Sequence, residues 1–189
     1  TAIAFFGSDP IALPCLRALR ERCADLEVVA VLTQPDRRSG RGRSLKMNSI
    51  KEWALSEGIS VRDPETPGPP EADWLRELGV DLTLVMAYGH LLKKDLLHAA
   101  PRGCFNLHAS LLPKYRGASP IETALAQGET RTGVTLMQVE PRMDAGPIVD
   151  AEVVEIAGDE DGPGLRRKLS LACVPLILRS LPGLIDGSS

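Results

Sequence analysis

The sequence predicts an α/β fold: an open, mostly parallel β-sheet flanked by helices, with an antiparallel edge. Short apolar runs typical of buried strands alternate along the chain with amphipathic segments typical of helices. The last two apolar runs, residues 133–140 and 148–156, are separated only by residues 141–147, which favours a hairpin at the sheet edge. The 189 residues, 43% of them hydrophobic, suffice for one buried core.

The first half of the chain repeats a strand–helix unit. Residues 1–6 form an apolar strand that runs into a turn at Gly7, a helix cap at Asp9 and a helix with Leu13 and Leu16 on its apolar face. The same patterns predict strands at residues 27–33, 59–61 and 81–87, helices at 49–57, 71–78 and 91–99, and a proline-rich linker at 64–70.

The second half begins with a strand at residues 104–108 and a helix at 119–127 that has Pro120 in its first turn. After the two edge strands, a closing helix is expected over residues 162–185, capped by Asp161. We expect Pro175 and Pro182 to kink or interrupt this helix, because proline cannot donate the helical hydrogen bond.

Two common phosphate-binding motifs do not occur. No glycines follow Gly7 at G-x-G-x-x-G spacing, and the chain contains no G-x-x-x-x-G-K-[ST] loop. The fold is therefore predicted to be Rossmann-like without the sequence features that bind NAD or ATP.

Metal, membrane and secretory functions are not indicated. The cysteines lack ligand spacing, and His90 and His98 have no acidic or cysteine partner at such spacing, so we expect no metal and interpret both histidines as surface or packing residues. We find no apolar run near 18 residues and no signal-like start, so a cytoplasmic protein without membrane contact is expected.

The charge is unevenly distributed. The formal net charge is −3, yet residues 34–48 contain one acidic residue, Asp36, and a cluster of cations: Arg37, Arg38, Arg41, Arg43 and Lys46. A basic segment on an otherwise acidic protein indicates one localised anionic partner.

The most informative stretch is the strand at residues 104–108 and the loop after it. Side chains alternate along a strand, so Asn106 and His108 point to the same side while Phe105 and Leu107 point into a core. In open α/β sheets ligands bind outside the carboxyl ends of strands, which is where this amide and imidazole lie.

Three segments carry a family resemblance that covers essentially the whole chain. Asn106-Leu107-His108-Ala109-Ser110-Leu111-Leu112-Pro113-Lys114-Tyr115-Arg116-Gly117 resembles the signature of the folate-dependent formyltransferases. Met143-Asp144-Ala145-Gly146 is similar to that family's Asp-x-Gly element, with Met and Ala where Leu and Thr are usual. Residues 33–43 resemble the methionyl-tRNA formyltransferase branch in particular.

The resemblance implies a catalytic set of Asn106, His108 and Asp144. When an amine attacks a formyl carbon, the amide of Asn106 can donate to the developing oxyanion without ionising. Histidine is the side chain whose charge changes nearest neutral pH, so the residue type of His108 suits proton transfer, and a carboxylate beside it would orient it. Whether His108 or Asp144 finally accepts the proton of the amine stays open.

The resemblance also implies the substrates and their contacts. The formyl donor is expected to be 10-formyltetrahydrofolate, and the acceptor the amino group of methionyl initiator tRNA, for translation initiation. The expected folate contacts are Tyr88, Gly89, Leu91, Leu92, Ser110, Leu111, Leu112, Pro113 and Val139. The expected tRNA contacts are Arg37, Arg38, Arg41, Arg43 and Lys46. Lys93 and Gly7-Ser8-Asp9 depart from the branch pattern, at positions that concern packing and the folate pocket.

Family members carry a further tRNA-binding domain, so residues 1–185 are expected to be the catalytic domain and residues 186–189 the start of a linker. We expect a monomer. Two alternatives have the same fold: a sugar-nucleotide N-formyltransferase, which would have no use for the arginine-rich segment, and a 10-formyltetrahydrofolate hydrolase. A catalytically inactive RNA-binding module is disfavoured by the intact catalytic set.

Overall fold

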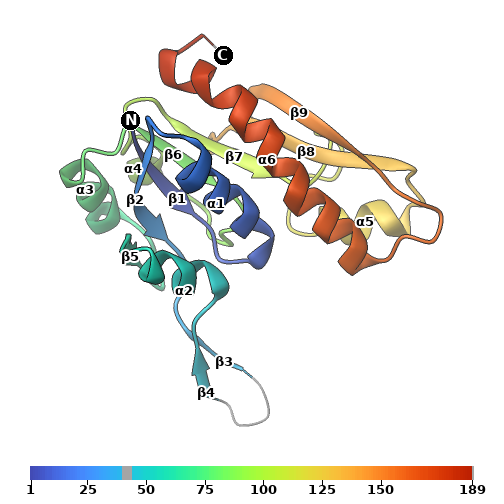
Figure 1. The fold of residues 1–189 in the computed structure, drawn as a ribbon, viewed down its shortest axis with the longest axis horizontal. Helices are drawn as coiled ribbons and strands as arrows, with labels where there is room; N and C mark the ends of the chain where they lie inside the picture. The colour runs from blue at the N-terminus through green and yellow to red at the C-terminus, as the bar shows by residue number, and fades with distance from the viewer. Residues whose placement is uncertain (40–43, 189) are drawn as a thin grey trace.

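The computed structural model describes residues 1–39 and 44–188. Its centre is a seven-stranded sheet of order β5-β2-β1-β6-β7-β8-β9 (Figure 1). The strands are β1 (Ala2–Phe6), β2 (Glu27–Leu32), β5 (Ser60–Arg62), β6 (Leu82–Val85), β7 (Cys104–His108), β8 (Arg131–Gln138) and β9 (Ile148–Glu155). Neighbours from β5 to β7 pair in parallel, and β8 pairs antiparallel with both β7 and β9. The predicted fold class, including its antiparallel edge, is confirmed.

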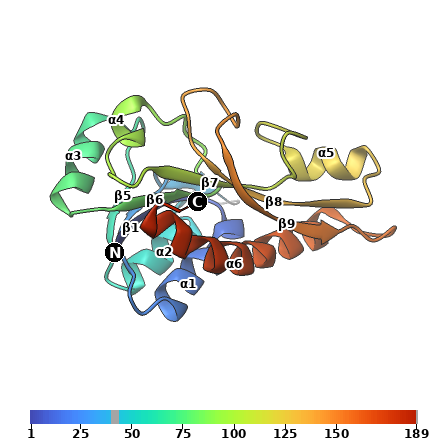
Figure 2. The same ribbon diagram turned by 90° about the horizontal axis from the view of Figure 1, so that it is seen from above.

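Strand β1 shows how the sheet forms two cores. Ile3 and Phe5 lie in one hydrophobic cluster, whereas Ala4 and Phe6 lie in the other, as the two-residue period of a strand requires. The first cluster is covered by α1 (Leu13–Arg22), α2 (Ser49–Ser56) and α6 (Gly162–Asp186), and the second by α3 (Pro69–Glu77) and α4 (Lys94–Leu97). Figure 2 shows these two groups of helices on opposite faces of the sheet.

The helix starts follow the predicted capping residues. The carboxylate of Asp9 accepts a hydrogen bond from the backbone N–H of Ile11 at 2.9 Å, at the start of the short 3-10 helix η1 (Pro10–Ala12) that leads into α1. The carboxylate of Asp161 accepts from Gly164 N–H at 2.7 Å at the start of α6. α5 (Pro120–Ala126) has Pro120 in its first turn, as predicted.

Helix α6 is continuous across both of its internal prolines, so of the two predicted effects of Pro175 and Pro182, a kink or an interruption, the interruption is wrong. Its buried face packs against α1, β8 and β9, and this packing outweighs the two missing backbone hydrogen bonds. The expectation of no apolar run near 18 residues also needs correction. Within the part of the chain that the structure describes, α6 is the one helix long and apolar enough to span a membrane, and half of its apolar window is buried inside this fold.

The boundaries of several elements differ from the predicted ones, most of all after strand β6. The predicted helix over residues 91–99 contracts to Lys94–Leu97. Ala87 has φ 50° and Gly89 has φ 81°, so the backbone turns sharply after the strand. Residues 90–93 therefore run outside helical structure, and the side chain of Leu91 is 69% exposed. Strand β5 begins one residue later than predicted, and α3 begins two residues earlier, at Pro69.

The basic segment forms a hairpin where the sequence indicates only a loop. Strand β3 (Arg37–Ser39) pairs antiparallel with β4 (Ser44–Lys46), separately from the main sheet. Figure 1 shows this hairpin projecting away from the rest of the domain. Arg41 and Arg43 lie outside the described residues.

The strand order reverses beside β1. Strands β2 and β5 follow β1 on one side, whereas β6 and β7 lie on its other side. The carboxyl ends of β1, β6 and β7 therefore open at a topological switch point, where ligand sites of open α/β sheets occur.

Candidate active site

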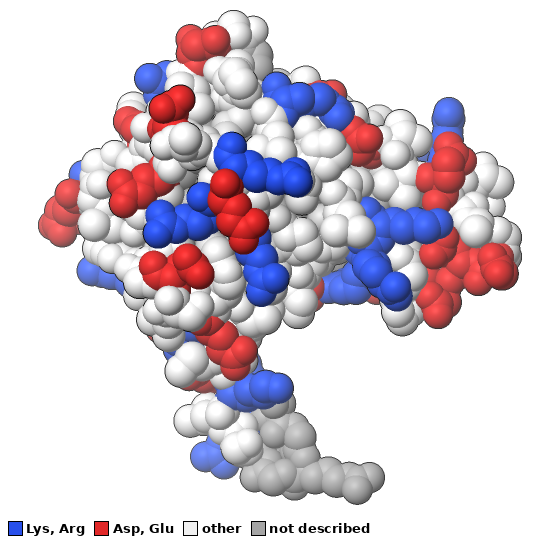
Figure 3. Space-filling view, viewed as in Figure 1, with Lys and Arg blue, Asp and Glu red and all other residues white. Residues whose placement is uncertain are grey.

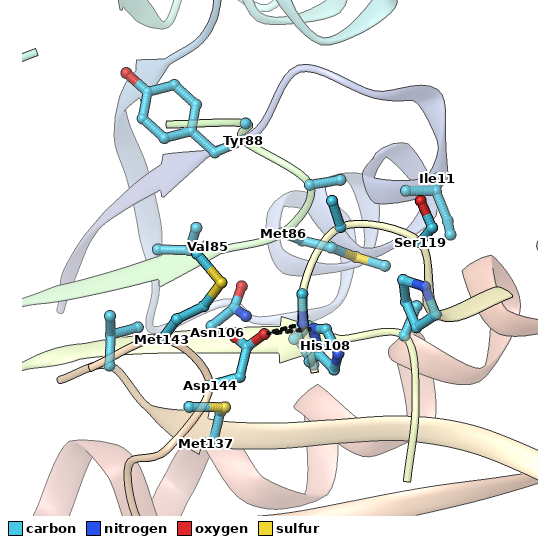
Figure 4. A pocket seen from close by; sticks show the side chains of 18 of the residues that line it. Ile11, Val85, Met86, Tyr88, Asn106, His108, Ser119, Met137, Met143 and Asp144 are labelled. Carbon is cyan, nitrogen blue, oxygen red and sulfur yellow. Dashed lines mark hydrogen bonds and ion pairs between the residues drawn. The ribbon is translucent and has the colours of Figure 1, made fainter. Parts of the chain in front are cut away.

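A cavity of about 590 Å³ opens at this switch point. Five segments line it: Ile11 after β1, residues 85–92 from the end of β6 onward, residues 106–109 at the end of β7, the loop and first turn at 117–122, and parts of residues 137–144. The remaining lining residue is Arg166 of α6. Figure 4 shows the side chains of this cavity, with Asn106, His108 and Asp144 turned toward one another.

His108 has a defined hydrogen-bond environment. Its Nε2 lies 2.9 Å from the carbonyl oxygen of Tyr115, and its Nδ1 lies 3.7 Å from Oδ2 of Asp144. A carbonyl oxygen only accepts hydrogen bonds, so Nε2 must carry the hydrogen. In neutral His108 the free lone pair therefore lies on Nδ1, on the side of Asp144.

Asp144 is positioned by the loop that follows β7. Its Oδ2 accepts a hydrogen bond from the backbone N–H of Gly117 at 2.9 Å. The residue has φ 47°, in the left-handed region that Asp tolerates better than most side chains. Gly146 follows in close contact with the carbonyl oxygen of Gln138, so a side chain at this position would collide with β8. The Asp-x-Gly segment thus packs tightly against β8 while it presents the carboxylate to His108.

Asn106 extends from the same side of β7 as His108, and its half-buried side chain lines the cavity. Within the described residues, its amide makes no hydrogen bond to another protein group. A primary amide in this position has both donor hydrogens available for a ligand oxygen.

Of the nine predicted folate contacts, the structure brings five to the cavity: Tyr88, Gly89, Leu91, Leu92 and Val139. The ring of Tyr88 is 2% exposed and packs against Phe6, with ring centroids 5.5 Å apart. Figure 4 shows this ring directed away from His108. Tyr88 therefore offers its backbone to the cavity, and not its phenol.

The other four predicted folate contacts, Ser110, Leu111, Leu112 and Pro113, do not line the cavity. The hydroxyl of Ser110 donates to the carbonyl of Lys114 at 2.6 Å. Thr135 of β8 donates to the carbonyl of Ser110 at 2.7 Å and accepts from the N–H of Leu112 at 3.1 Å. These residues anchor the loop that holds His108 and Asp144.

Some lining residues were not predicted. Arg166 is the one Lys or Arg among the described residues that line the cavity, and it forms an ion pair with Asp9. His90, interpreted from sequence as a surface or packing residue, lines the cavity with its ring edge against Tyr88, and its buried Nε2 has no partner among the described residues. Only the position of residue 90 in the segment that follows a predicted strand could have indicated this location.

The cationic hairpin lies outside this cavity but is connected to it. Gln34, at the base of the hairpin, donates from its side chain to the carbonyl of Tyr88 at 3.2 Å. Arg38 and Lys46 are exposed, whereas Arg37 forms a two-bond ion pair with Glu65, each bond 3.1 Å long. A hollow of about 270 Å³ is lined by Ser8 and by residues of the hairpin base, and the backbone N–H of Gln34 donates to the hydroxyl of Ser8 at 3.0 Å. The described residues contain no cluster of three or more potential metal ligands.

The chain is similar to known proteins over nearly its whole length. It is 42% identical over 186 residues to the methionyl-tRNA formyltransferase of Halorhodospira halophila (strain DSM 244 / SL1), an alignment that covers 98% of this chain and 59% of that protein. It is 47% identical over 169 residues to the methionyl-tRNA formyltransferase of Xanthomonas euvesicatoria pv. vesicatoria (strain 85-10), covering 89% of this chain and 54% of that protein. The chain thus spans a little more than half the length of these curated relatives.

The fold has solved counterparts. The phosphoribosylglycinamide formyltransferase of Bacillus halodurans superposes with a TM-score of 0.82 at 24% identity, covering 100% of this chain and 97% of that chain. This likeness shows the same Rossmann-like fold. The formyl transferase family model matches residues 1–177 of the 189. The chain therefore belongs to the formyl transferase family.

Proposed function

We propose that this chain is the catalytic domain of a methionyl-tRNA formyltransferase. It transfers a formyl group from 10-formyltetrahydrofolate to the amino group of methionyl initiator tRNA, acting as a cytoplasmic monomer. The observation that carries the proposal is the convergence of Asn106, His108 and Asp144 in the cavity of a formyl transferase family member. The names and the identity of its methionyl-tRNA formyltransferase relatives support the choice of acceptor.

The cavity suits a reduced folate as the formyl donor. Its volume of about 590 Å³ lies within the range of sites that bind drug-sized molecules. Near the β6 end the wall combines apolar side chains, such as Leu92 and Val139, with exposed backbone at Gly89. Such a wall accepts a flat heterocycle. The folate supplies the one-carbon unit and the nitrogen that leaves.

The reaction needs stabilisation of negative charge on the formyl oxygen. The side-chain N–H of Asn106 donates to this oxygen, and one such donor contributes about 3 to 4 kcal/mol to lowering the barrier. Because Nε2 of His108 is engaged with Tyr115, Nδ1 is the ring nitrogen that is able to change its protonation during the reaction. A protonated Nδ1 donates to the same oxygen, and Asp144 stabilises the resulting positive charge.

The proton balance then follows. The bond from the acceptor nitrogen to the formyl carbon forms, the bond from that carbon to the folate nitrogen breaks, and one proton moves from the first nitrogen to the second. Two routes fit the site, through Nδ1 of His108 or through the carboxylate of Asp144. The pH–rate profiles of His108→Ala and Asp144→Asn distinguish these routes.

The β3–β4 hairpin is consistent with a formyl acceptor that is an anionic macromolecule. Arg37, Arg38 and Lys46 lie on an arm that projects from the domain, and Figure 3 shows blue cationic side chains on it. Together with Arg41 and Arg43, which lie outside the described residues, they are proposed to contact tRNA phosphates. Arg166 lies on the cavity wall, and we propose that it contacts the acceptor end of the tRNA.

The domain boundaries remain part of the proposal. Residues 1–185 form the proposed catalytic domain, and residues 186–189 begin the proposed linker. Helix α6 ends at Asp186, where Gly187 with φ 78° caps it. The alignments with the curated relatives cover 59% and 54% of those proteins.

The test is formyl transfer from 10-formyltetrahydrofolate to methionyl initiator tRNA. It compares wild type with His108→Ala, and uses His98→Ala, an exposed histidine outside the cavity, as the matched control. Both this chain and this chain extended by a relative's C-terminal region are assayed. Transfer that falls about a hundredfold or more only in His108→Ala supports the proposal. Formate release or sugar formylation without tRNA formylation overturns the acceptor assignment.

A further inference from the structure

Glu129 lies outside the cavity, in the connection between α5 and β8, yet it is linked to His108 through a single residue. Its Oε1 accepts a hydrogen bond from the hydroxyl of Tyr115 at 2.6 Å and from the ammonium of Lys114 at 2.7 Å. The carbonyl of the same Tyr115 contacts Nε2 of His108 at 2.9 Å. Glu129, Tyr115 and His108 therefore form a continuous chain from the protein surface to the cavity.

The backbone of Tyr115 needs such support. Its φ of 54° lies in the left-handed region, which is unfavourable for a side chain with a Cβ. On the inner side, Ser110 holds the preceding carbonyl, that of Lys114. On the outer side, the phenol of Tyr115 reaches Glu129. The carbonyl of Tyr115 thus projects toward His108 from a segment that is fixed on both sides.

The Glu129 carboxylate is well suited to this anchoring role. Hydrogen bonds from Lys114 and from Tyr115 hold the pKa of this carboxyl below its usual value, so it is ionised at neutral pH. A hydrogen bond from a phenol to an ionised carboxylate is stronger than one to a neutral oxygen. The same loop also donates Gly117 N–H to Asp144, so a displacement of Tyr115 alters both partners of His108.

We infer that Glu129 is a positioning residue for His108. Through Tyr115 it fixes the hydrogen of neutral His108 on Nε2 and leaves Nδ1 as the nitrogen that exchanges protons in the cavity. Its effect on the rate rests on the proposed formyl transfer, whereas the protonated nitrogen of His108 can be measured without any substrate.

The first experiment records long-range ¹H–¹⁵N spectra of protein labelled at its histidines, with the His108 signal assigned by comparison with His108→Ala. The wild type is expected to show His108 protonated at Nε2 in its neutral form. Glu129→Ala and Tyr115→Phe are each expected to give a mixture of Nε2-H and Nδ1-H forms. Glu129→Gln, which retains an acceptor oxygen, is expected to restore most of the Nε2-H form.

Lys114→Ala is the matched control, because it removes the exposed ion pair to Glu129 and leaves the Tyr115 hydrogen bond. It is expected to keep the wild-type tautomer and rate. If wild-type His108 is protonated at Nδ1, or if Glu129→Ala and Tyr115→Phe both leave the tautomer unchanged, the inference is overturned. Tyr115→Phe keeps the test valid if Glu129→Ala does not fold.

Steady-state kinetics provide the second readout. Glu129→Ala and Tyr115→Phe are expected to lower kcat about tenfold with little change in the KM for the formyl donor, because His108 loses its orientation while the donor-binding wall is intact. A rise in KM at unchanged kcat contradicts a positioning role. If the tautomer shifts as expected but wild type formylates no tRNA, the proposed function fails and the assignment of Glu129 stands.

Discussion

The cavity and the β3–β4 hairpin meet at the hydrogen bond from Gln34 to the carbonyl of Tyr88, but they are built differently. In the cavity, His108 is 7% exposed, and its two ring nitrogens face fixed partners on two separate loops, at Tyr115 and Asp144. On the hairpin, Arg38 and Lys46 are exposed and extend from a two-stranded arm. The cavity fixes the positions of a few candidate catalytic groups, whereas the hairpin exposes positive charge to solvent.

This difference indicates how each region is expected to respond to change. Groups held in a desolvated site contribute through geometry, so one substitution has a large effect. Exposed cations contribute through summed charge that salt screens, so each one has a small effect. Substitutions in the two regions should therefore differ in size and in what they alter.

The largest effect is expected from Asn106→Ala. Removal of one oxyanion donor should lower kcat about a hundredfold or more, equivalent to about 3 kcal/mol, with little change in thermal stability. Formyl-transfer kinetics and the unfolding midpoint measure the two quantities. A decrease in kcat of less than threefold would show that the amide of Asn106 does not contact the reacting oxygen. It would also contradict the expectation that single substitutions in the cavity have large effects.

The next effect concerns the anchor beneath the cavity. Thr135→Val removes the buried hydroxyl that donates a hydrogen bond to the carbonyl of Ser110 and accepts one from the N–H of Leu112. A buried carbonyl and a partly buried N–H lose their partner, so the free energy of unfolding should fall by about 2 kcal/mol, measured by urea titration. Thr130→Val, at an exposed site, is the matched control and should change it by less than about 0.5 kcal/mol. Equal effects would indicate that the loop is not held from β8.

A smaller effect is expected at the base of the hairpin. Lys51 lies between Asp36 and Asp63, with Nζ–O distances of 2.7 and 2.8 Å. Burial lowers the pKa of Lys51, but the hydrogen bonds and charges of the two aspartates outweigh this and raise it. Lys51→Met should lower stability at pH 7 by about 1 kcal/mol, whereas Lys94→Met, at an exposed site, should not.

The pH dependence of the Lys51 contribution has a definite sign. Because the pKa is raised in the folded state, the contribution is fully present below the unfolded value of about 10.4 and is lost as the pH rises through the folded value. Urea titrations at pH 7 and above pH 10 measure the difference between wild type and Lys51→Met. A difference that grows at alkaline pH would contradict the pairing.

The smallest effects are expected on the hairpin itself. Arg38→Ala and Lys46→Ala should each reduce the slope of log affinity for tRNA against log salt concentration by about 1, while kcat is retained. Arg22→Ala, at the exposed end of α1, should leave the slope unchanged. Binding titrations at several salt concentrations provide the measurement. If all variants show the wild-type slope, the hairpin residues do not contact tRNA phosphates.

Local pattern was sufficient for much of the molecule. Periodicity two predicted that Asn106 and His108 share one side of a strand, and apolar runs predicted the strands of the main sheet with its antiparallel edge. Capping by Asp9 and Asp161 was also predictable, because a cap depends on neighbours three residues away at most. These features depend on interactions between residues that are close together in the chain, and such interactions can be inferred directly from the sequence.

Features that depend on distant residues were decided only by the tertiary structure. The left-handed backbone at Ala87 and the packing of residues 90–93 shortened the predicted helix, and burial kept α6 continuous through Pro175 and Pro182. Ser110 anchors the loop and does not line the cavity. Arg166 reaches the cavity, and Glu129 reaches Tyr115, because the fold brings together segments that are distant in the chain, and no local sequence pattern indicates such contacts. Sequence by itself determined the fold class, because it follows from local periodicity, and it indicated three candidate catalytic groups through the resemblance of short motifs to those of a known family. Only the tertiary structure decided which nitrogen of His108 faces the chemistry, because the carbonyl and carboxylate that decide it come from separate loops.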